Sequence, residues 1–193
     1  MFEEHNDKKA AADEMLEVLI SWDVPIDEND RKKFKTNFVK GFLVMYKKYR
    51  KFFASKAAKR SRSWSFEDYK NQIRRGVLQS FDESADYAQK AKAHLDKSYV
   101  ADGVVLLGNA YGSLFSAIEY GLTQSLFEVQ KGDEEHILKC VAIFVNALQG
   151  KHKLKHSFIA HRVKKIAAKT EGSLSKEKFA LITNIMKELI GLT

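Results

Sequence analysis

The residue types best suited to chemistry gather between Gly150 and Lys165, where three of the six histidines stand among six Lys and Arg residues. His152 and His156 are four positions apart, so both side chains lie on one face of a helix. Two histidines at this spacing can share a metal ion, but a metal site needs a third ligand. His161 lies off that face, and the chain has no HExxH motif. The sequence therefore predicts no metal site and no cofactor.

The same stretch carries the groups that cleave RNA without a metal. That reaction needs a base for the 2′-hydroxyl, an acid for the leaving oxygen, and a cation for the phosphorane. Histidine titrates near neutral pH and suits the first two roles, and Lys or Arg suits the third. Gly150 is expected to end the preceding helix, so a helix start with free backbone N–H groups follows it. The candidate acid and base are His156 and His152, and the candidate phosphate clamps are Lys151, Lys155 and Arg162. The alternative is that all five are solvated side chains of a basic helix.

A second basic region runs from Lys47 to Arg62, where eight of sixteen residues are cationic and none is acidic. The chain as a whole has a net charge of +8, which suits a polyanionic partner such as RNA through the release of counterions. Nearby Tyr46, Tyr49 and Phe53 could stack on bases, but their spacing favours a place in the core. The candidate phosphate contacts in this region are Lys47, Lys48, Arg50, Lys51, Arg60 and Arg62.

Glu119 is a carboxylate inside a mostly apolar segment, residues 99–131, that is rich in small residues. This segment is expected to be the central helix of a bundle. A buried carboxylate needs a cation or hydrogen-bond donors, and Asn109 and Ser113 could help to satisfy buried polar groups. Cys140, in the apolar segment 133–148, is predicted to be a core residue and not a nucleophile.

Composition indicates an all-α protein. The 193 residues include only one proline and ten glycines, so few loops are expected. With one cysteine, neither a disulfide framework nor a cysteine-based zinc site is expected, which fits a reducing cytoplasm. The polar start is not a signal peptide, and no apolar run is long enough to cross a membrane.

Apolar periodicity and capping residues predict a single helical domain over residues 1–193 with about seven helices. Ser65–Asp68 resembles a capping box that opens a helix ending near Phe81, and a new helix is expected to begin at Asp82 or Ser84. Residues 1–64 are assigned to N-terminal helices with a basic face, and residues 65–193 to a helical core. The expected helices span residues 7–22, 30–58, 65–81, 82–95, 99–131, 133–148, 151–168 and 175–190.

The segment from about Phe81 to Lys165 resembles the AbiV-like abortive-infection branch of the HEPN superfamily. Its members have a helix ending in a motif like A-x-E-E-x-G-K, then another helix, then a His/Lys motif. Here Glu119 and Gly121 match the first motif, while Tyr120 stands for its second Glu and Leu122 for its Lys. A rival register, 126–132, offers Glu128 and Lys131. The His/Lys motif corresponds to residues 150–156.

The resemblance implies a HEPN-like helical core that dimerises and acts on RNA in phage defence. Many HEPN domains are ribonucleases with an R-x4-6-H motif. The nearest spacings here are Lys151-x4-His156 and Lys155-x5-His161. Lys keeps the positive charge of Arg but lacks its bidentate grip on phosphate. In this scheme Glu119 orients the Lys/His pair.

The leading functional prediction is a cytoplasmic, homodimeric abortive-infection protein that acts on RNA or translation, as a metal-independent ribonuclease with a phage-encoded or host activator. One alternative is a non-catalytic nucleic-acid-binding subunit of a defence or ribonucleoprotein complex that uses Lys47–Arg62. The other is a protein-interaction bundle whose charge serves solubility.

Overall fold

The structure is a computed structural model that describes residues 26–58, 64–148, 163–166, 168 and 172–190, together with 9, 12, 13 and 16. Within these residues it contains helices and no strands, so the all-α prediction is confirmed. The elements are α2 (Glu28–Ala58), α3 (Phe66–Asp96), α4 (Val100–Ser116), the π-helix η1 (Ala117–Leu122), α5 (Asp133–Leu148) and α7 (Lys176–Ile190). None of the described helices is long and apolar enough to cross a membrane.

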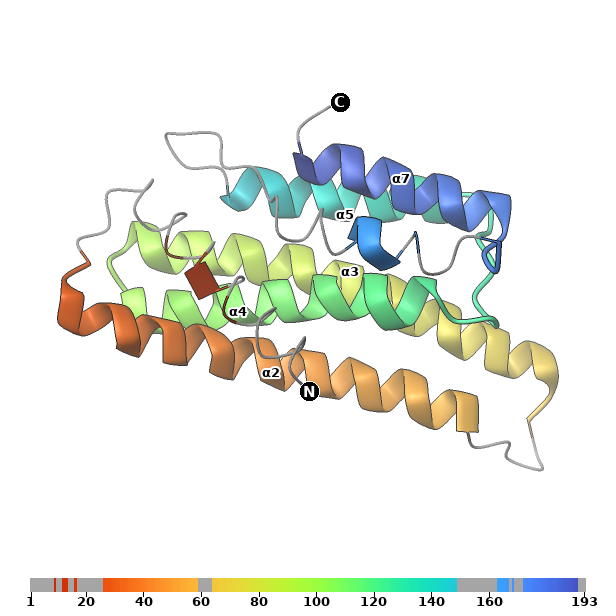
Figure 1. The fold of residues 1–193 in the computed structure, drawn as a ribbon, viewed down its shortest axis with the longest axis horizontal. Coiled ribbons are helices and arrows are strands. Elements are labelled where there is room, and N and C mark those ends of the chain that lie inside the picture. Colours follow the sequence, from red (N-terminus) through yellow and green to blue (C-terminus); the bar gives the residue numbers. More distant parts are fainter. Residues whose placement is uncertain are drawn as a thin grey trace.

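The helices pack side by side with their axes roughly aligned (Figure 1). In space the neighbours follow the order α2, α4, α3, α5, α7, because α2 packs chiefly on α4, α4 on α3, α3 on α5, and α5 on α7. The helix α2 therefore forms one outer edge of the bundle, and α5 and α7 form the opposite edge. One continuous hydrophobic core runs through all of these helices.

The helix α2 carries a buried aromatic stripe on one face and basic residues on the other. Asp27 caps its start by accepting a hydrogen bond from the backbone N–H of Asp30 at 2.7 Å. Glycines allow α2 and α4 to approach closely: a Cβ added at Gly108 would lie 2.2 Å from the carbonyl oxygen of Phe38. The buried stripe consists of Phe34, Phe38, Phe42, Met45, Tyr49 and Phe53.

The helix α3 begins at the predicted capping box, in which the Asp68 backbone N–H donates to the Ser65 hydroxyl at 3.1 Å. The prediction of two helices, ending near Phe81 and restarting at Asp82 or Ser84, is wrong, because α3 is continuous to Asp96. No glycine or proline lies at this point to break the helix. Ser84 is 1% exposed and faces the interior, and Ala85, Ala88 and Ala91, which follow it, are buried.

The single helix predicted over 99–131 is also wrong at its C-terminal half. The α-helix ends at Ser116 and continues as a π-helix to Leu122, after which residues 123–132 form turns and irregular structure. Lys178, on α7, donates a hydrogen bond of 2.7 Å to the carbonyl of Gln124, just past the end of η1. The buried Phe127 anchors the irregular segment to the core.

The predicted helices over 133–148 and 175–190 are confirmed. α5 begins at Asp133 as expected, and in α7 the Ser175 hydroxyl accepts a hydrogen bond from the Lys178 N–H at 3.3 Å. The predicted helix over 7–22 and most of the one over 151–168 lie outside the described residues, although 163–166 are helical.

Candidate functional site

The predicted site residues fall into two groups. Glu119, Lys47, Lys48, Arg50 and Lys51 are described by the structure. The others lie outside the described residues: His152, His156, His161, Lys151, Lys155, Arg162, Arg60 and Arg62.

The basic region is longer than its densest part. Residues 31–66 contain thirteen Lys and Arg and no Asp or Glu, whereas the rest of the chain carries twenty Lys and Arg against 25 Asp and Glu. The net positive charge of the protein thus comes entirely from this segment, most of which is α2.

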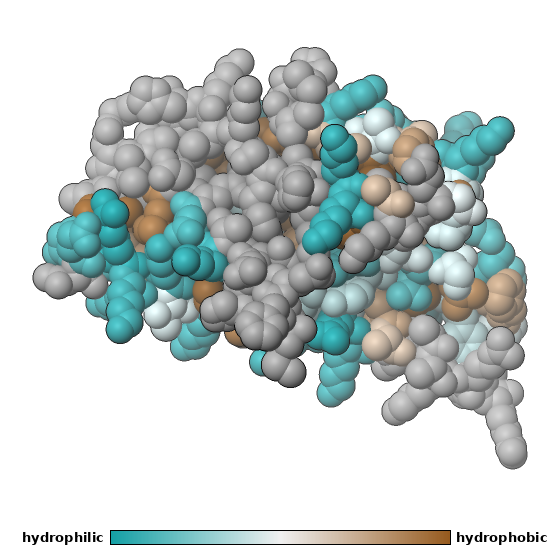
Figure 2. Space-filling model, viewed as in Figure 1, coloured by the Kyte–Doolittle hydropathy of each residue, from teal (hydrophilic) through white to brown (hydrophobic). Residues whose placement is uncertain are grey.

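Four lysines of α2 form one exposed row, the α2 lysine stripe: Lys33, Lys40, Lys47 and Lys51. Their spacings of seven, seven and four residues keep them within about 40° of arc on the helix, directly opposite the buried aromatic stripe. The row extends about 27 Å along the helix axis. In Figure 2, hydrophilic side chains project from the lower left edge of the molecule, where Figure 1 places the first half of α2.

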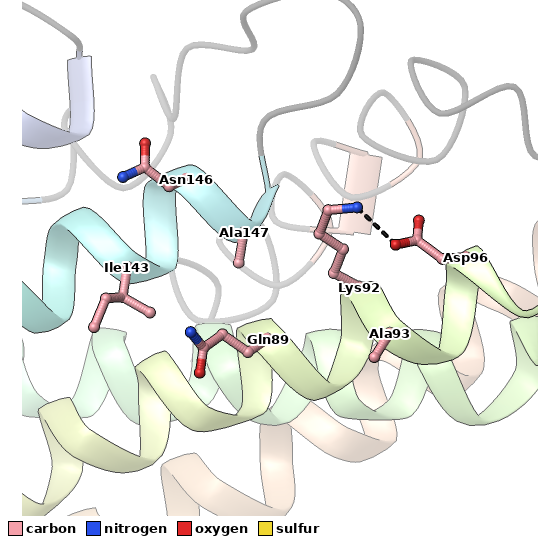
Figure 3. Close-up of a pocket in the computed structure, with 7 residues that line it drawn as sticks. All are labelled: Gln89, Lys92, Ala93, Asp96, Ile143, Asn146 and Ala147. Atoms are coloured by element: carbon pink, nitrogen blue, oxygen red, sulfur yellow. Dashed lines mark hydrogen bonds and ion pairs between the residues drawn. The ribbon is translucent and has the colours of Figure 1, made fainter.

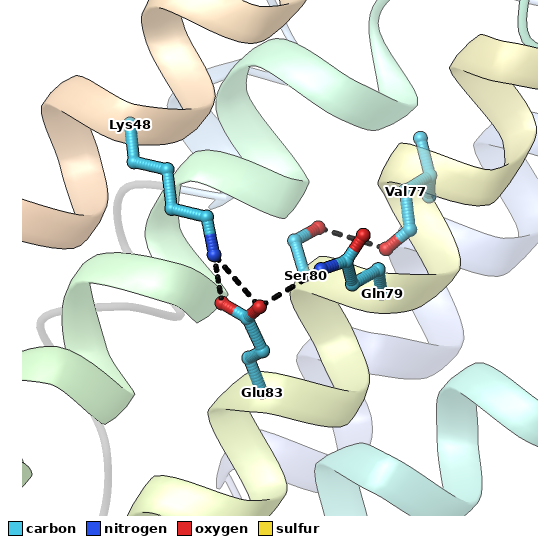
Figure 4. Close-up of polar contacts among 5 residues, drawn as sticks. All are labelled: Lys48, Val77, Gln79, Ser80 and Glu83. Atoms are coloured by element: carbon cyan, nitrogen blue, oxygen red, sulfur yellow. Dashed lines mark hydrogen bonds and ion pairs between the residues drawn. The ribbon is translucent and has the colours of Figure 1, made fainter.

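Lys48 has a different position from the lysines of the stripe. Its Nζ lies 2.7 and 2.8 Å from the two carboxylate oxygens of Glu83 on α3, and the Gln79 amide donates to the same carboxylate at 3.0 Å (Figure 4). Lys48 therefore ties α2 to α3. The neighbouring Tyr49 is 2% exposed, and its burial, together with Glu83, raises the pKa of its phenol far above the ordinary range.

Glu119 belongs to a second group, the Glu119 cluster, which consists of Glu119, Tyr46, Tyr120 and Arg50. The Tyr46 hydroxyl donates to the Glu119 carboxylate at 3.3 Å and lies 2.7 Å from the Tyr120 hydroxyl. Because a hydroxyl carries one hydrogen, Tyr120 donates to Tyr46 when Tyr46 donates to Glu119. The donor that the buried carboxylate was predicted to need is thus a tyrosine of α2.

Two consecutive residues of the cluster, Glu119 and Tyr120, belong to the π-helix. Glu119 and Tyr120 both reach Tyr46 on α2, within the π-helical segment Ala117–Leu122. Such wider turns are rare and often occur at functional sites. The Arg50 guanidinium lies 5.9 Å from the centre of the Tyr120 ring, so the cluster extends from the half-buried Glu119 to the basic surface of α2.

The rival register of the Glu motif leads to a different surface. Glu128 is exposed and its carboxylate lies 2.7 Å from Nζ of Lys70, while Lys131 is also exposed. The Glu128–Lys70 pair is a solvent-facing contact between α3 and the irregular segment. Of the two candidate carboxylates, Glu119 is the one for which the structure shows a contact with α2, through the Tyr46 hydroxyl.

The three aromatic residues near the basic region belong to the core, in agreement with the prediction from their spacing. Tyr46, Tyr49 and Phe53 are all at most 3% exposed. The buried atoms Asn109 Oδ1 and Ser113 Oγ have no protein hydrogen-bond partner among the described residues, so these atoms do not supply the expected compensation.

Two aromatic residues that were not singled out from the sequence are exposed instead. Trp64 and Phe66 are 38% and 58% exposed and lie at the start of α3, separated from α2 by residues 59–63 alone. The centre of the Phe66 ring lies 5.1 Å from Nζ of Lys70. Their position next to Arg60 and Arg62 is the sequence signal that could have identified them.

A shallow pocket of about 420 Å³ opens between the C-terminal halves of α3 and α5 (Figure 3). Among the described lining residues, the charged ones are Lys92 and Asp96, which pair with each other at 2.7 Å. The pocket therefore offers no unpaired acid, base or nucleophile. It is lined by Gln89, Lys92, Ala93, Asp96, Ile143, Asn146 and Ala147.

Comparisons with protein-family models, with curated proteins and with solved structures found no match to this chain.

Proposed function

We propose that this protein binds RNA along the α2 lysine stripe, as an RNA-directed protein of the abortive-infection type that its sequence resembles. The observation that carries the proposal is the stripe itself. Lys33, Lys40, Lys47 and Lys51 are exposed and have no ion pair within the described residues, and residues 31–66 hold no acid that could compete with phosphate.

The spacing of the stripe suits a flexible polyanion. Successive lysines are about 6 to 11 Å apart along the helix axis, a separation that long Lys side chains can adapt to a backbone of phosphates. Binding by such a row is driven by counterion release and needs no base-specific contact. The exposed rings of Trp64 and Phe66, beyond the end of α2, supply planar surfaces on which unpaired bases stack. Single-stranded RNA is therefore the expected ligand.

The test compares two variants of equal net charge. In the first, Lys33, Lys40, Lys47 and Lys51 become Gln. In the control, the exposed Lys97, Lys131, Lys176 and Lys187 become Gln. Affinity for a labelled single-stranded RNA is measured over a range of salt concentrations. The stripe variant should reduce the slope of log K against log salt by about three, because each lost phosphate contact contributes about 0.7 for single strands.

The control variant should bind almost as tightly as the wild type. Equal losses in both variants would show that binding follows net charge and not the stripe. A protein with no RNA affinity at about 50 mM salt would leave only the protein-interaction alternative.

A second candidate function is metal-independent ribonuclease activity, and the Glu119 cluster favours it. Glu119 accepts a hydrogen bond from Tyr46, and the Arg50 guanidinium lies over the ring of the adjacent Tyr120, so a carboxylate is held near the edge of the proposed RNA surface. In the proposed mechanism His156 or His152 transfers protons, Lys151 and Lys155 clamp the phosphate, and Glu119 orients the Lys/His pair.

Purified protein should then shorten RNA in a metal-free buffer. His156→Ala should abolish cleavage while RNA affinity stays unchanged, and Glu119→Gln should lower it without unfolding the chain, since the amide oxygen still accepts from Tyr46. RNA that binds and remains intact, with or without lysate from infected cells as a source of activator, would identify a non-catalytic binding protein.

From the resemblance we also propose that the protein acts in phage defence as a homodimer. Cells expressing the wild type should lose RNA integrity or translation after infection, and cells expressing the stripe variant should not. Light scattering of the purified chain tests the dimer.

A further inference from the structure

Three side chains of metal-ligand type converge at the junction of α3 and α5: Asp82, His136 and Cys140. Asp82 Oδ1 lies 2.8 Å from His136 Nε2 and 3.4 Å from Cys140 Sγ, and the sulfur lies 3.9 Å from the same ring nitrogen. All three atoms lie within 4.8 Å of one another. No other group of three such ligands occurs among the residues that the structure describes.

Two helices hold these groups in place. His136 and Cys140 are four residues apart on α5, so their side chains lie on one face one turn apart. Asp82 comes from the continuous middle of α3, which packs along α5. The site is half open, because Cys140 is buried while the side chains of Asp82 and His136 are 53% and 45% exposed.

The separations approach those of a tetrahedral zinc site. Zinc bonds of about 2.0–2.2 Å to N and O and about 2.3 Å to S place neighbouring ligand atoms about 3.3–3.6 Å apart. Of the observed separations, 3.4 Å lies within this range, 2.8 Å lies below it and 3.9 Å lies above it. A shift of about half an ångström in the exposed Asp82 and His136 side chains is enough to open the shortest contact to that range.

The same residues do not form a nucleophilic triad. A relay needs the two ring nitrogens to face different partners, but Asp82 and Cys140 both lie on the Nε2 side of His136. Burial, with the nearby Asp82, also raises the pKa of the Cys140 thiol to about 12, so the metal-free residue is a poor nucleophile at neutral pH.

We propose that Asp82, His136 and Cys140 bind a divalent transition-metal ion, Zn²⁺ foremost, with the fourth position open to water or an added ligand. Thiolate, imidazole and carboxylate together favour zinc or cobalt over magnesium or calcium. On binding, the Cys140 thiol releases its proton to solvent. The hydrogen on His136 moves from Nε2 to Nδ1, so that the Nε2 lone pair can meet the metal. The ion then bridges α3 and α5.

Cobalt(II) tests the proposal because Cys140 is the only cysteine. A thiolate-to-cobalt charge-transfer band in the near ultraviolet can therefore come only from this residue. The reduced, chelator-treated full-length protein is titrated with Co²⁺ and then with Zn²⁺. One equivalent of Co²⁺ should give this band together with visible bands of four-coordinate intensity, and Zn²⁺ should bleach both.

Variants separate this site from the histidines near the C-terminus. Cys140→Ser should remove the band, and His136→Ala or Asp82→Asn should weaken Zn²⁺ at least tenfold in competition with a chelator. Circular dichroism checks that each variant is folded. His94→Ala and the double variant His152→Ala/His156→Ala should keep the band. Absence of the band in the wild type, its loss in either control, or unchanged Zn²⁺ affinity in folded His136→Ala and Asp82→Asn would overturn the proposal.

Discussion

At the scale of single residues, the hydroxyl of Tyr46 holds the Glu119 cluster together. It contacts both Glu119 and Tyr120 and is almost fully buried. Tyr46→Phe keeps the ring in the core but leaves a half-buried carboxylate without this donor. We expect a loss of about 1–3 kcal/mol in the free energy of unfolding, measured by urea denaturation.

Tyr99→Phe is the control for that experiment, because Tyr99 is 61% exposed. It should change stability by less than about 0.5 kcal/mol. Equal effects of the two substitutions would contradict the hydrogen-bond chain.

A second prediction at this scale concerns Lys178, which is 6% exposed and donates to the carbonyl of Gln124. Burial lowers the pKa of its ammonium below the ordinary 10.5, against the attraction of Glu128. Between the lowered pKa and 10.5 the unfolded chain binds more protons than the native one, so stability rises with pH in this window. The wild type should therefore gain stability relative to Lys178→Met as the pH rises towards 10.5.

The measurement is the difference in unfolding free energy between wild type and variant over a series of pH values, in which the other titrations cancel. Lys187→Met, on the exposed face of the same helix, is the matched control for the removal of a lysine from α7. A constant difference for Lys178→Met would contradict the prediction.

The sequence predicted the need of Glu119 for a donor, because a carboxylate in an apolar run has few alternatives. It did not predict Tyr46 as that donor, which lies 73 residues earlier in the chain. Asp82 could not be predicted as a neighbour of His136 for the same reason, because the two residues are 54 positions apart in the chain. Contacts between distant residues depend on the order in which helices pack, and local periodicity carries no information on that order.

At the scale of helices, periodicity predicted α2, α5 and α7 well because each has one apolar face and a capping residue. It failed at Asp82 and Ser84, which have the chemistry of caps but stand within α3. It failed again beyond Leu122, where the apolar pattern continues although the helix has ended. Phe127 is buried from an irregular segment, which shows that burial alone does not require a helix.

The contact between α2 and α4 gives a prediction at this scale. A Cβ at Gly108 would lie 2.2 Å from a backbone carbonyl of α2, so Gly108→Ala must force the two helices apart. Although alanine favours a helix by about 1 kcal/mol, we expect a net loss of about 2 kcal/mol or more in thermal or urea unfolding.

Gly76→Ala is the matched control, because the three atoms nearest its added Cβ all belong to the ring of Phe52, a partly exposed side chain that can move. Its cost should stay within about 1 kcal/mol. A smaller loss for Gly108→Ala than for Gly76→Ala would contradict the close backbone packing.

At the scale of the whole molecule, the basic helix is part of the core. The sequence predicts a single domain over residues 1–193, with basic-faced N-terminal helices over 1–64 and a helical core over 65–193. In the structure α2 packs chiefly on α4, and its residues Phe38 and Phe53 are fully buried in the same hydrophobic cluster as α5 and α7. One helix thus presents lysines to solvent and aromatic rings to the core.

This arrangement predicts that the fragment 64–193 does not fold by itself. Without α2, the surface of α4 that carries Tyr111 and Phe115 would face water, and too little apolar area would remain buried to offset the conformational entropy of the chain. Circular dichroism of the fragment should show reduced helicity and no cooperative thermal transition, with strong binding of a hydrophobic dye. A peptide of residues 26–63 added in trans should restore the transition, whereas the same peptide with Phe38→Asp and Phe53→Asp should not. A cooperative transition in the fragment alone would instead show that α2 is not needed for folding, and the α2 lysine stripe could then be removed without loss of the fold.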